Sequence, residues 1–292
     1  MKKPKVIQIG SMTDRYNDRM VATWKAHQLW KEADKDGFLA DHGAEFEVVA
    51  TSARYGLTDA QMEKMPNLKA ICSFGVGYDA IDVAAAKRRS IQVSNTPHVL
   101  NDCVADLAMG LTLDVARRMS EMDRFTRAGG WLAGAPPLGT QVFRKKIGII
   151  GLGRIGRAVV QRSSGFEMKV GYTDPVQDHR VKYHYEPTAK GLAAWADFLV
   201  VTCIGGPSTR NLVDAGVLAA LGPKGYLINV SRGSVVDEAA LVAAVTEGTI
   251  AGAGLDVYVD EPRVPEALLT APNVVVLPHI ASGTVETRLA ME

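Results

Sequence analysis

The chain has 292 residues, 47% of them apolar, and a formal net charge of +1. This length exceeds the usual size of a single hydrophobic core, so two domains are expected. Acidic and basic residues are interspersed, without the basic stripe that follows a phosphate backbone, so no nucleic-acid partner is expected. No apolar run is long enough to span a bilayer, so no membrane partner is expected either.

The apolar run after the basic N-terminus covers only residues 6–9, which predicts a first strand rather than a signal peptide. The cysteines Cys72, Cys103 and Cys203 are far apart and show no metal-ligand spacing. Such usage is typical of a reducing compartment. We therefore expect a cytoplasmic protein.

Short apolar runs alternate with helical patterns along the whole chain, which is typical of parallel sheets flanked by helices. The predicted strands are residues 6–9, 46–50, 68–72, 91–93, 147–150, 168–173, 198–202, 226–230, 252–256 and 274–277. The first four would form one doubly wound domain and the last six another. Residues 14–41 predict an amphipathic helix and its flanks.

The stretch between the two sets of strands begins with residues 101–119, whose apolar positions recur at helical spacing. This pattern predicts one long, mostly buried helix that connects the domains. Residues 129–139 are rich in glycine and proline and contain Trp131, which predicts a surface loop or arm.

A glycine fingerprint follows the predicted strand 147–150 and precedes helical residues 157–162; it consists of Gly151, Leu152, Gly153, Arg154, Ile155 and Gly156. Strand, turn and helix in this order are what a dinucleotide-binding turn requires. Gly151 would permit the tight turn, Gly153 the approach of a pyrophosphate, and Gly156 the close packing of helix on strand.

Asp174 ends the strand 168–173, roughly twenty residues beyond the fingerprint, where an acidic residue binds the adenosine ribose hydroxyls and repels a 2′-phosphate. This position favours NAD(H), with NADP(H) as the alternative. Asp174 could instead be only a turn residue before Pro175. Arg180 and Lys182 lie nearby and would weaken the discrimination.

Three further residues occupy positions after predicted strands, where doubly wound sheets bind their ligands. Arg232 would hold the carboxylate and carbonyl of a 2-oxo acid. His279 would transfer a proton near neutral pH, and Glu261 would hold its imidazole by a hydrogen bond. Each residue alone is more often structural, as a surface ion pair, a core histidine or a turn. Together with the fingerprint they predict redox chemistry.

Other catalytic classes have less support. The remaining histidines lack a cluster with cysteine or carboxylate at metal spacing, so no metal is expected; they are His27, His42, His98, His179 and His184. Ser231 and Ser234 lack a nucleophile elbow, which argues against a serine hydrolase.

These residues resemble the D-isomer-specific 2-hydroxyacid dehydrogenases, and within them the glyoxylate and hydroxypyruvate reductase-like branch. The resemblance runs from about residue 68 to the end of the chain. It rests on the fingerprint and on FGVGYD (74–79), VADLA (104–108), GGPSTR (205–210), NVSRGSVVD (229–237), GLDVY (254–258) and LPHI (277–280).

The resemblance implies an α/β fold of two doubly wound parallel-sheet domains with the active site in the cleft. Residues 1–97 with 281–292 would form the flavodoxin-like substrate domain, and residues 98–280 the Rossmann NAD(P)-binding domain. It also implies a homodimer formed through the cofactor domains. The reaction would be NAD(P)H-dependent reduction of small 2-oxo acids, such as glyoxylate or hydroxypyruvate, to D-2-hydroxy acids.

The resemblance assigns the same roles to Arg232, His279 and Glu261, and adds the backbone of Val76 and Gly77 as a receptor for the substrate carboxylate. Further cofactor contacts are implied at Ile204, Pro207, Thr209, Val230 and Asp256, the last near the nicotinamide carboxamide. Trp131 would either reach a partner subunit's active site or pack in the dimer.

Two features depart from the family pattern. Close members of the branch often use NADP and carry basic or small residues after the second cofactor strand, whereas residues 173–175 here resemble NAD-using members. Family chains also usually continue beyond the histidine through a long helix and a tail, whereas residues 280–292 remain here. The alternatives are a non-catalytic, corepressor-like dinucleotide sensor and a formate or phosphite dehydrogenase on the same scaffold.

Overall fold

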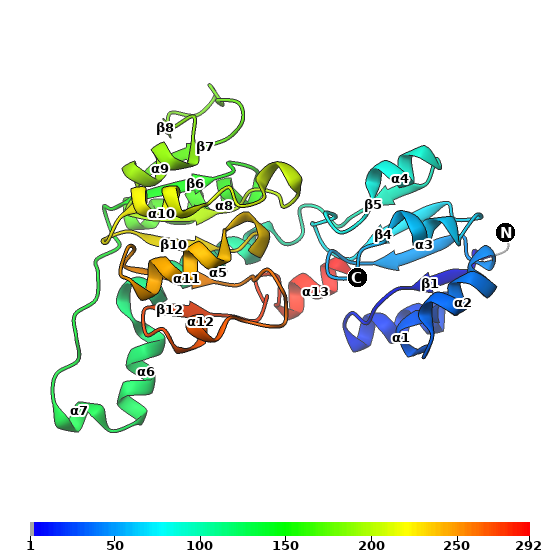
Figure 1. The fold of residues 1–292 in the computed structure, drawn as a ribbon, viewed down its shortest axis with the longest axis horizontal. Helices are drawn as coiled ribbons and strands as arrows, with labels where there is room; N and C mark the ends of the chain where they lie inside the picture. The colour runs from blue at the N-terminus through cyan, green and yellow to red at the C-terminus, as the bar shows by residue number, and fades with distance from the viewer. Residues whose placement is uncertain (1–2) are drawn as a thin grey trace. The chain divides into compact units, whose positions relative to one another are not determined.

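The computed structural model describes residues 3–292 and divides into two compact units. The first runs to Leu100 and also includes Val285–Glu292, and the second is Asn101–Thr284. In Figure 1 the first unit is blue and cyan with a red terminal helix, and the second runs from green to orange. Each unit has its own sheet and its own buried core.

The described part of the first unit contains a five-stranded parallel sheet in the order β2-β1-β3-β4-β5. Its strands are β1 (Val6–Gln8), β2 (His27–Gln28), β3 (Val48–Thr51), β4 (Ala70–Ser73) and β5 (Gln92–Ser94). The side chains of Ile7, Val49 and Ile71 form the centre of its core with no exposed surface. Four strands were predicted here; the two-residue strand β2 was missed because it is too short to show periodicity.

The helices of the first unit are α1 (Asp14–Trp24), α2 (Lys35–His42), α3 (Asp59–Glu63), α4 (Val83–Arg88) and α13 (Val285–Met291), with 3₁₀ turns η1 (Leu29–Lys31) and η2 (Gly43–Glu45). Helices α1 to α4 each begin after a Thr or Asp whose side chain accepts a backbone N–H of the first turn; these are Thr13, Asp34, Thr58 and Asp82. Such N-caps fix where a helix starts. Residues 14–41 therefore contain two helices, where one was predicted.

The second unit contains a seven-stranded sheet in the order β12-β11-β10-β9-β6-β7-β8, with every pair parallel. Its strands are β6 (Lys146–Ile150), β7 (Lys169–Thr173), β8 (His184–Tyr185), β9 (Phe198–Val201), β10 (Tyr226–Asn229), β11 (Gly252–Leu255) and β12 (Val274–Val276). The short strand β8 was not predicted. The strand order reverses between β6 and β9, which is the place where such sheets bind dinucleotides.

The helices of the second unit are α5 (Asn101–Arg117), α6 (Met119–Arg127), α7 (Gly130–Ala133), α8 (Arg154–Ser163), α9 (Ala189–Trp195), α10 (Ala215–Leu221), α11 (Glu238–Thr246) and α12 (Glu266–Thr270), with η3 (Ser164–Phe166), η4 (Pro207–Thr209) and η5 (Gly233–Val235). All four residues of β9, β10 and β11 are buried. This explains why these strands appear in the sequence as continuous runs of buried-type residues rather than alternating patterns.

The stretch predicted as one helix over residues 101–119 is interrupted. Helix α5 ends at Arg117, Arg118 takes a left-handed conformation with φ of 56°, and α6 begins at Met119. Helices α6 and α7 and the chain after them extend away from the sheet of this unit as an arm (Figure 1). The arm carries exposed apolar side chains, with Trp131 70% and Leu132 96% exposed. Among residues 3–292, none of the helices has the length and apolar character needed to cross a bilayer.

Candidate active site at one edge of the second sheet

Most of the predicted site residues follow strands of the seven-stranded sheet. β6, β7, β9, β10, β11 and β12 lead respectively to Gly151, Asp174, Ile204, Arg232, Asp256 and His279. Because all strands are parallel, their carboxyl ends meet at one edge of the sheet. The topology therefore brings the fingerprint and the predicted catalytic residues of this unit to the same edge.

The fingerprint has the geometry that a pyrophosphate requires. Gly151 has φ of +92°, and a Cβ there would lie 2.6 Å from Cα of Cys203. A Cβ on Gly156 would lie 2.3 Å from the carbonyl oxygen of Gly151. A Cβ on Gly153, in contrast, would meet nothing within 4 Å. Helix α8 begins immediately afterwards at Arg154, so its first backbone N–H groups suit an anion over this open position.

Asp174 lies against the fingerprint itself. Its Oδ2 accepts a hydrogen bond from the backbone N–H of Leu152 at 2.7 Å. Its backbone carbonyl accepts the hydroxyl of Tyr185 at 3.2 Å. The carboxylate is thus held beside the dinucleotide turn, at the end of β7, where a ribose-binding acid belongs.

Arg232 is positioned by its neighbours in the turn after β10. The Asn229 side chain donates to the carbonyl of Arg232 at 2.9 Å and accepts the N–H of Ser231 at 3.1 Å. The Arg232 guanidinium donates to the Ser231 carbonyl at 2.7 Å. A Cβ on Gly233 would lie 2.0 Å from the backbone of Tyr258, so only glycine permits this turn to approach the chain after β11.

Glu261 and His279 form a direct pair. The imidazole Nδ1 lies 2.7 Å from Oε2 of Glu261, while Oε1 accepts the backbone N–H of Tyr258 at 3.2 Å. Because a carboxylate only accepts hydrogen bonds, Nδ1 is the donor and Nε2 is left to exchange a proton. The His279 side chain is 43% exposed and can be reached from solvent.

The electrostatics of Glu261 favour its ionised form. Burial alone would raise its pKa, but the hydrogen bond from His279 and the charge of that residue lower the pKa below its usual value. The Tyr258 amide and the charge of Arg232 act in the same direction. Arg232, Glu261 and His279 therefore form one electrostatically linked group in the second unit.

Asp256 contacts the backbone that follows His279, and its expected position near a nicotinamide carboxamide stays a prediction. Its side chain is completely buried, and its two oxygens accept the backbone N–H groups of Ile280 and Ala281 at 2.7 and 2.8 Å. Burial raises the pKa of this carboxyl, although both amides oppose the rise. Asp256 thus holds the backbone immediately after His279. The sequence could have indicated this role, because an acidic residue at the end of a buried strand needs hydrogen-bond donors.

The other implied cofactor residues lie at the same edge. Ile204 is 72% exposed in the turn after β9, and Thr209 Oγ1 donates to its carbonyl at 2.7 Å. Pro207 begins η4, and Val230 is buried directly after β10. A side-chain hydrogen bond thus stabilises the turn that would face a bound dinucleotide.

Val76 and Gly77 belong to the first unit, in the loop after β4. Their carbonyl oxygens accept hydrogen bonds from the side chains of Asn95 at 2.9 Å and Ser73 at 3.2 Å. Gly75 precedes them with φ of +134°, which favours glycine. The loop is therefore anchored through its carbonyl groups, which leaves the anion-receptor role of its backbone N–H groups as a prediction.

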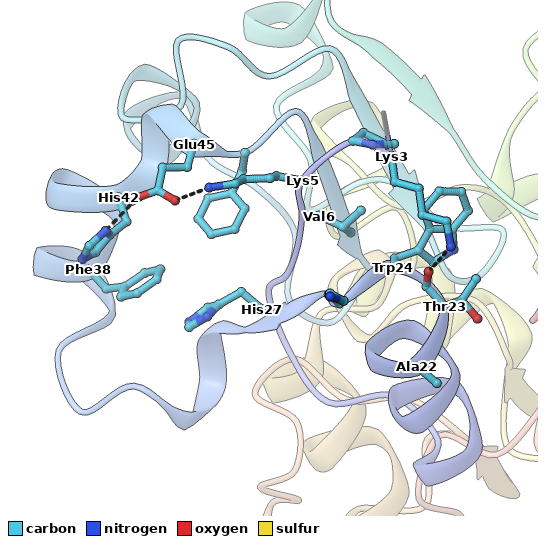
Figure 2. A pocket seen from close by; sticks show the side chains of 13 residues that line it. Lys3, Lys5, Val6, Ala22, Thr23, Trp24, His27, Phe38, His42 and Glu45 are labelled. Atoms are coloured by element: carbon cyan, nitrogen blue, oxygen red, sulfur yellow. Dashed lines mark hydrogen bonds and ion pairs between the residues drawn. The ribbon is translucent and has the colours of Figure 1, made fainter. Parts of the chain in front are cut away.

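The first unit also contains a pocket of about 580 Å³ at the amino-terminal ends of its strands. Figure 2 shows aromatic and basic side chains around it, with Lys5 donating to Glu45 at 2.7 Å. It is lined by Lys3, Pro4, Lys5, Val6, Ala22, Thr23, Trp24, Lys25, His27, Phe38, His42, Glu45 and Phe46. None of the predicted site residues is among them. Within residues 3–292, no group of three or more His, Cys, Asp or Glu residues could hold a metal ion.

Comparisons with known proteins find relatives over nearly the whole chain. Residues 109–281 match the model of the D-isomer specific 2-hydroxyacid dehydrogenase NAD binding domain. The chain is 42% identical to a glyoxylate/hydroxypyruvate reductase of Arabidopsis thaliana over 98% of this chain and 91% of that protein. It is 39% identical to a 2-ketogluconate reductase of Gluconobacter oxydans over 99% of this chain and 92% of that protein.

A solved structure is similarly close. The NADPH-dependent glyoxylate/hydroxypyruvate reductase of Sinorhizobium meliloti, in complex with NADP and malonate, superposes with a TM-score of 0.90. The sequence identity is 41%, and the match covers 99% of this chain and 90% of that chain.

Proposed function

Because the chain belongs to the D-isomer specific 2-hydroxyacid dehydrogenase family, we propose that it reduces small 2-oxo acids of the glyoxylate and hydroxypyruvate type with NADH. It is an oxidoreductase with a nicotinamide dinucleotide-binding domain, and its relatives support the reduction of 2-oxo acids. The observation that carries the proposal is the Glu261–His279 pair, which lies at the same sheet edge as the fingerprint. The positive charge of Arg232 acts on this pair by lowering the pKa of Glu261.

The proposed roles follow from these contacts. When a dinucleotide is bound, it would supply the hydride for the carbonyl carbon. Arg232 holds the substrate carboxylate and carbonyl oxygen by charge-assisted hydrogen bonds, which also polarises the carbonyl. Protonated His279 donates its Nε2 proton to that oxygen, so one hydride and one proton together would convert the carbonyl group to a hydroxyl group. Glu261 keeps the ring oriented through Nδ1.

The preference for NADH is supported by Asp174, whose carboxylate lies on the fingerprint. A second negative charge at this corner, such as a 2′-phosphate, would be repelled. The Sinorhizobium meliloti relative is NADPH-dependent, so the assay must compare both cofactors directly.

The remaining roles are also part of the proposal. The first unit would serve as the substrate domain, with Val76 and Gly77 receiving the substrate carboxylate through backbone N–H groups. The protein would be a cytoplasmic homodimer. The exposed arm around Trp131 supports the dimer, because large exposed apolar side chains mark interaction surfaces.

The test is an absorbance assay of NADH and NADPH oxidation with glyoxylate, hydroxypyruvate, pyruvate and an aromatic 2-oxo acid. We expect NADH oxidation with the small acids, and His279→Asn should reduce kcat by about 10²- to 10⁴-fold while NADH binding is kept. Unchanged turnover in that variant would refute the role of His279. Dinucleotide binding without turnover of any 2-oxo acid, formate or phosphite would indicate a sensor instead.

A further inference from the structure

The loop after β7 contains a cluster of one carboxylate and two guanidinium groups. Asp178 accepts Nε of Arg180 at 2.8 Å, Nη2 of Arg180 at 2.9 Å and the backbone N–H of Arg180 at 3.0 Å. It also accepts Nη2 of Arg157. The Asp178 side chain is only 16% exposed, whereas Arg157 and Arg180 are 43% and 86% exposed. One carboxylate therefore joins two cations at the surface.

The position of Asp178 is fixed from the core. Tyr172, the penultimate residue of β7, is 1% exposed. Its hydroxyl accepts the backbone N–H of Asp178 at 2.8 Å and donates to the carbonyl of the same residue at 3.3 Å. Both backbone polar groups of Asp178 are thus attached to a buried side chain of the sheet. These two hydrogen bonds fix the backbone of Asp178 and so hold its carboxylate between the two arginines.

The cluster lies beside the dinucleotide turn. Arg157 directly follows Gly156, and its N–H bonds to the carbonyl of Gly153 in the first turn of α8. Asp178 is four positions after Asp174, which itself contacts the fingerprint at Leu152. In this class of sheet, the corner between the second strand and the first helix receives the adenosine ribose, and arginine there binds the 2′-phosphate of NADP.

We propose that Asp178 is a specificity-determining residue that occupies, with its own carboxylate, the anion position between Arg157 and Arg180 that a 2′-phosphate would need. This inference rests on the proposed function, because it concerns how the same site chooses between NADH and NADPH. Asp178 acts through the two arginines and not by touching the reacting atoms. In this proposal Asp174 repels the 2′-phosphate, and Asp178 pairs with the two arginines that would otherwise bind it.

The chemistry of the cluster supports this role. Arg180 uses both arms of its fork on the two Asp178 oxygens, a geometry that a phosphate would otherwise receive. The side chain and amide of Arg180, joined by Arg157 and opposed by burial, hold the pKa of Asp178 well below its usual range. The carboxylate is therefore ionised at neutral pH.

The decisive variant is Asp178→Asn, which keeps the shape of the side chain and removes its charge. Dissociation constants of NADH, NADPH and 2′,5′-ADP are measured on the full chain by fluorescence or calorimetry, without any need for turnover. We expect NADPH and 2′,5′-ADP to bind about tenfold more tightly, a change of about 1.4 kcal/mol in binding free energy. The affinity for NADH should change by less than about threefold, since NADH carries no group for the released arginines.

The matched control is Glu167→Gln. Glu167 pairs with Arg144 at 2.8 Å at the opposite, amino-terminal end of β7, so this variant changes the net charge equally without touching the cluster. It should leave the ratio of NADPH to NADH affinity unchanged. Replacing Arg157 and Arg180 by alanine in the Asp178→Asn background should abolish the gain.

The outcomes separate this inference from the proposed function. An Asp178→Asn protein that binds NADH normally but gains less than twofold for NADPH overturns the inference, as does a gain that survives loss of both arginines. Asp178→Ser provides a second neutral variant if the first is unstable. A wild-type protein that already prefers NADPH contradicts the proposed NADH preference, while the change on neutralising Asp178 still decides the role of that residue.

Discussion

Glu261 and His279 are 18 positions apart in the chain, yet a contact of 2.7 Å joins Oε2 of the carboxylate to Nδ1 of the imidazole. The second oxygen of Glu261 is occupied by the Tyr258 amide, so the carboxylate is held from both sides. The pair thereby fixes the roles of the two ring nitrogens: Nδ1 donates to Glu261, and Nε2 is left to exchange a proton.

Glu261→Gln should lower kcat by about 10²-fold, because a neutral amide stabilises the imidazolium less well than a carboxylate. NADH affinity should not change, since Glu261 lies after β11 and is not part of the glycine fingerprint. Steady-state kinetics with NADH titrations check both points. A variant with wild-type kcat would contradict the pairing as a catalytic device.

The same residue should contribute to acid stability. The pKa of Glu261 is lowered in the folded protein from its ordinary value of 4.5. Its ionisation therefore stabilises the fold above about pH 4.5, and this contribution is lost as the pH falls through the lower, folded value. Unfolding curves of Glu261→Gln should be less pH-dependent in this acid range than those of wild type. Glu247→Gln, at an exposed position, provides the control.

Arg232→Lys keeps the positive charge but removes the planar fork. We expect kcat/KM for a 2-oxo acid to fall by about 10²-fold, because the lysine ammonium lacks the rigid planar fork that orients two oxygens at once. The melting temperature should change little, since the backbone of the turn is held by Asn229. Equal kcat/KM in the variant would show that only charge matters at this position.

Asp256→Asn should act on His279 through the backbone. An asparagine can accept one of the two amides of Ile280 and Ala281 but presents an N–H₂ group to the other. The buried mismatch should destabilise the protein by about 1–3 kcal/mol and reduce kcat more than it raises KM. Urea unfolding and the split between kcat and KM check this. Unchanged kcat in a destabilised variant would limit Asp256 to a structural role.

Gly153→Ala and Gly156→Ala provide a matched pair within the fingerprint. The methyl group on Gly156 would collide with a carbonyl oxygen at 2.3 Å, whereas the one on Gly153 would meet nothing within 4 Å. Gly156→Ala should therefore lower the melting temperature. Gly153→Ala should leave it unchanged while it weakens dinucleotide binding by filling the space over the turn. Scanning calorimetry with and without NADH distinguishes the two, and equal melting losses would contradict the assignment.

The sequence predicted the fold class because its signals are local. Apolar runs of strand length and the strand–glycine–helix order sufficed to predict two parallel-sheet domains, and the family match confirms the class. The strands β2 and β8, of two residues each, were missed because only their pairing partners define them. The predicted helix ended at residue 119, so neither the left-handed conformation of Arg118 nor the helix α6 after it was predicted.

The sequence also identified Arg232, Glu261 and His279 as candidates, because positions after parallel strands share one edge in any doubly wound sheet. The contact between Glu261 and His279 was also predicted, and the neighbouring strands β11 and β12 bring the two residues together. The anchoring of Ile280 and Ala281 by Asp256 and the clamping of Arg157 and Arg180 by Asp178 appear only in three dimensions. Local patterns encode the elements, whereas the partners of a charged side chain depend on distant segments that only the folded sheet brings together.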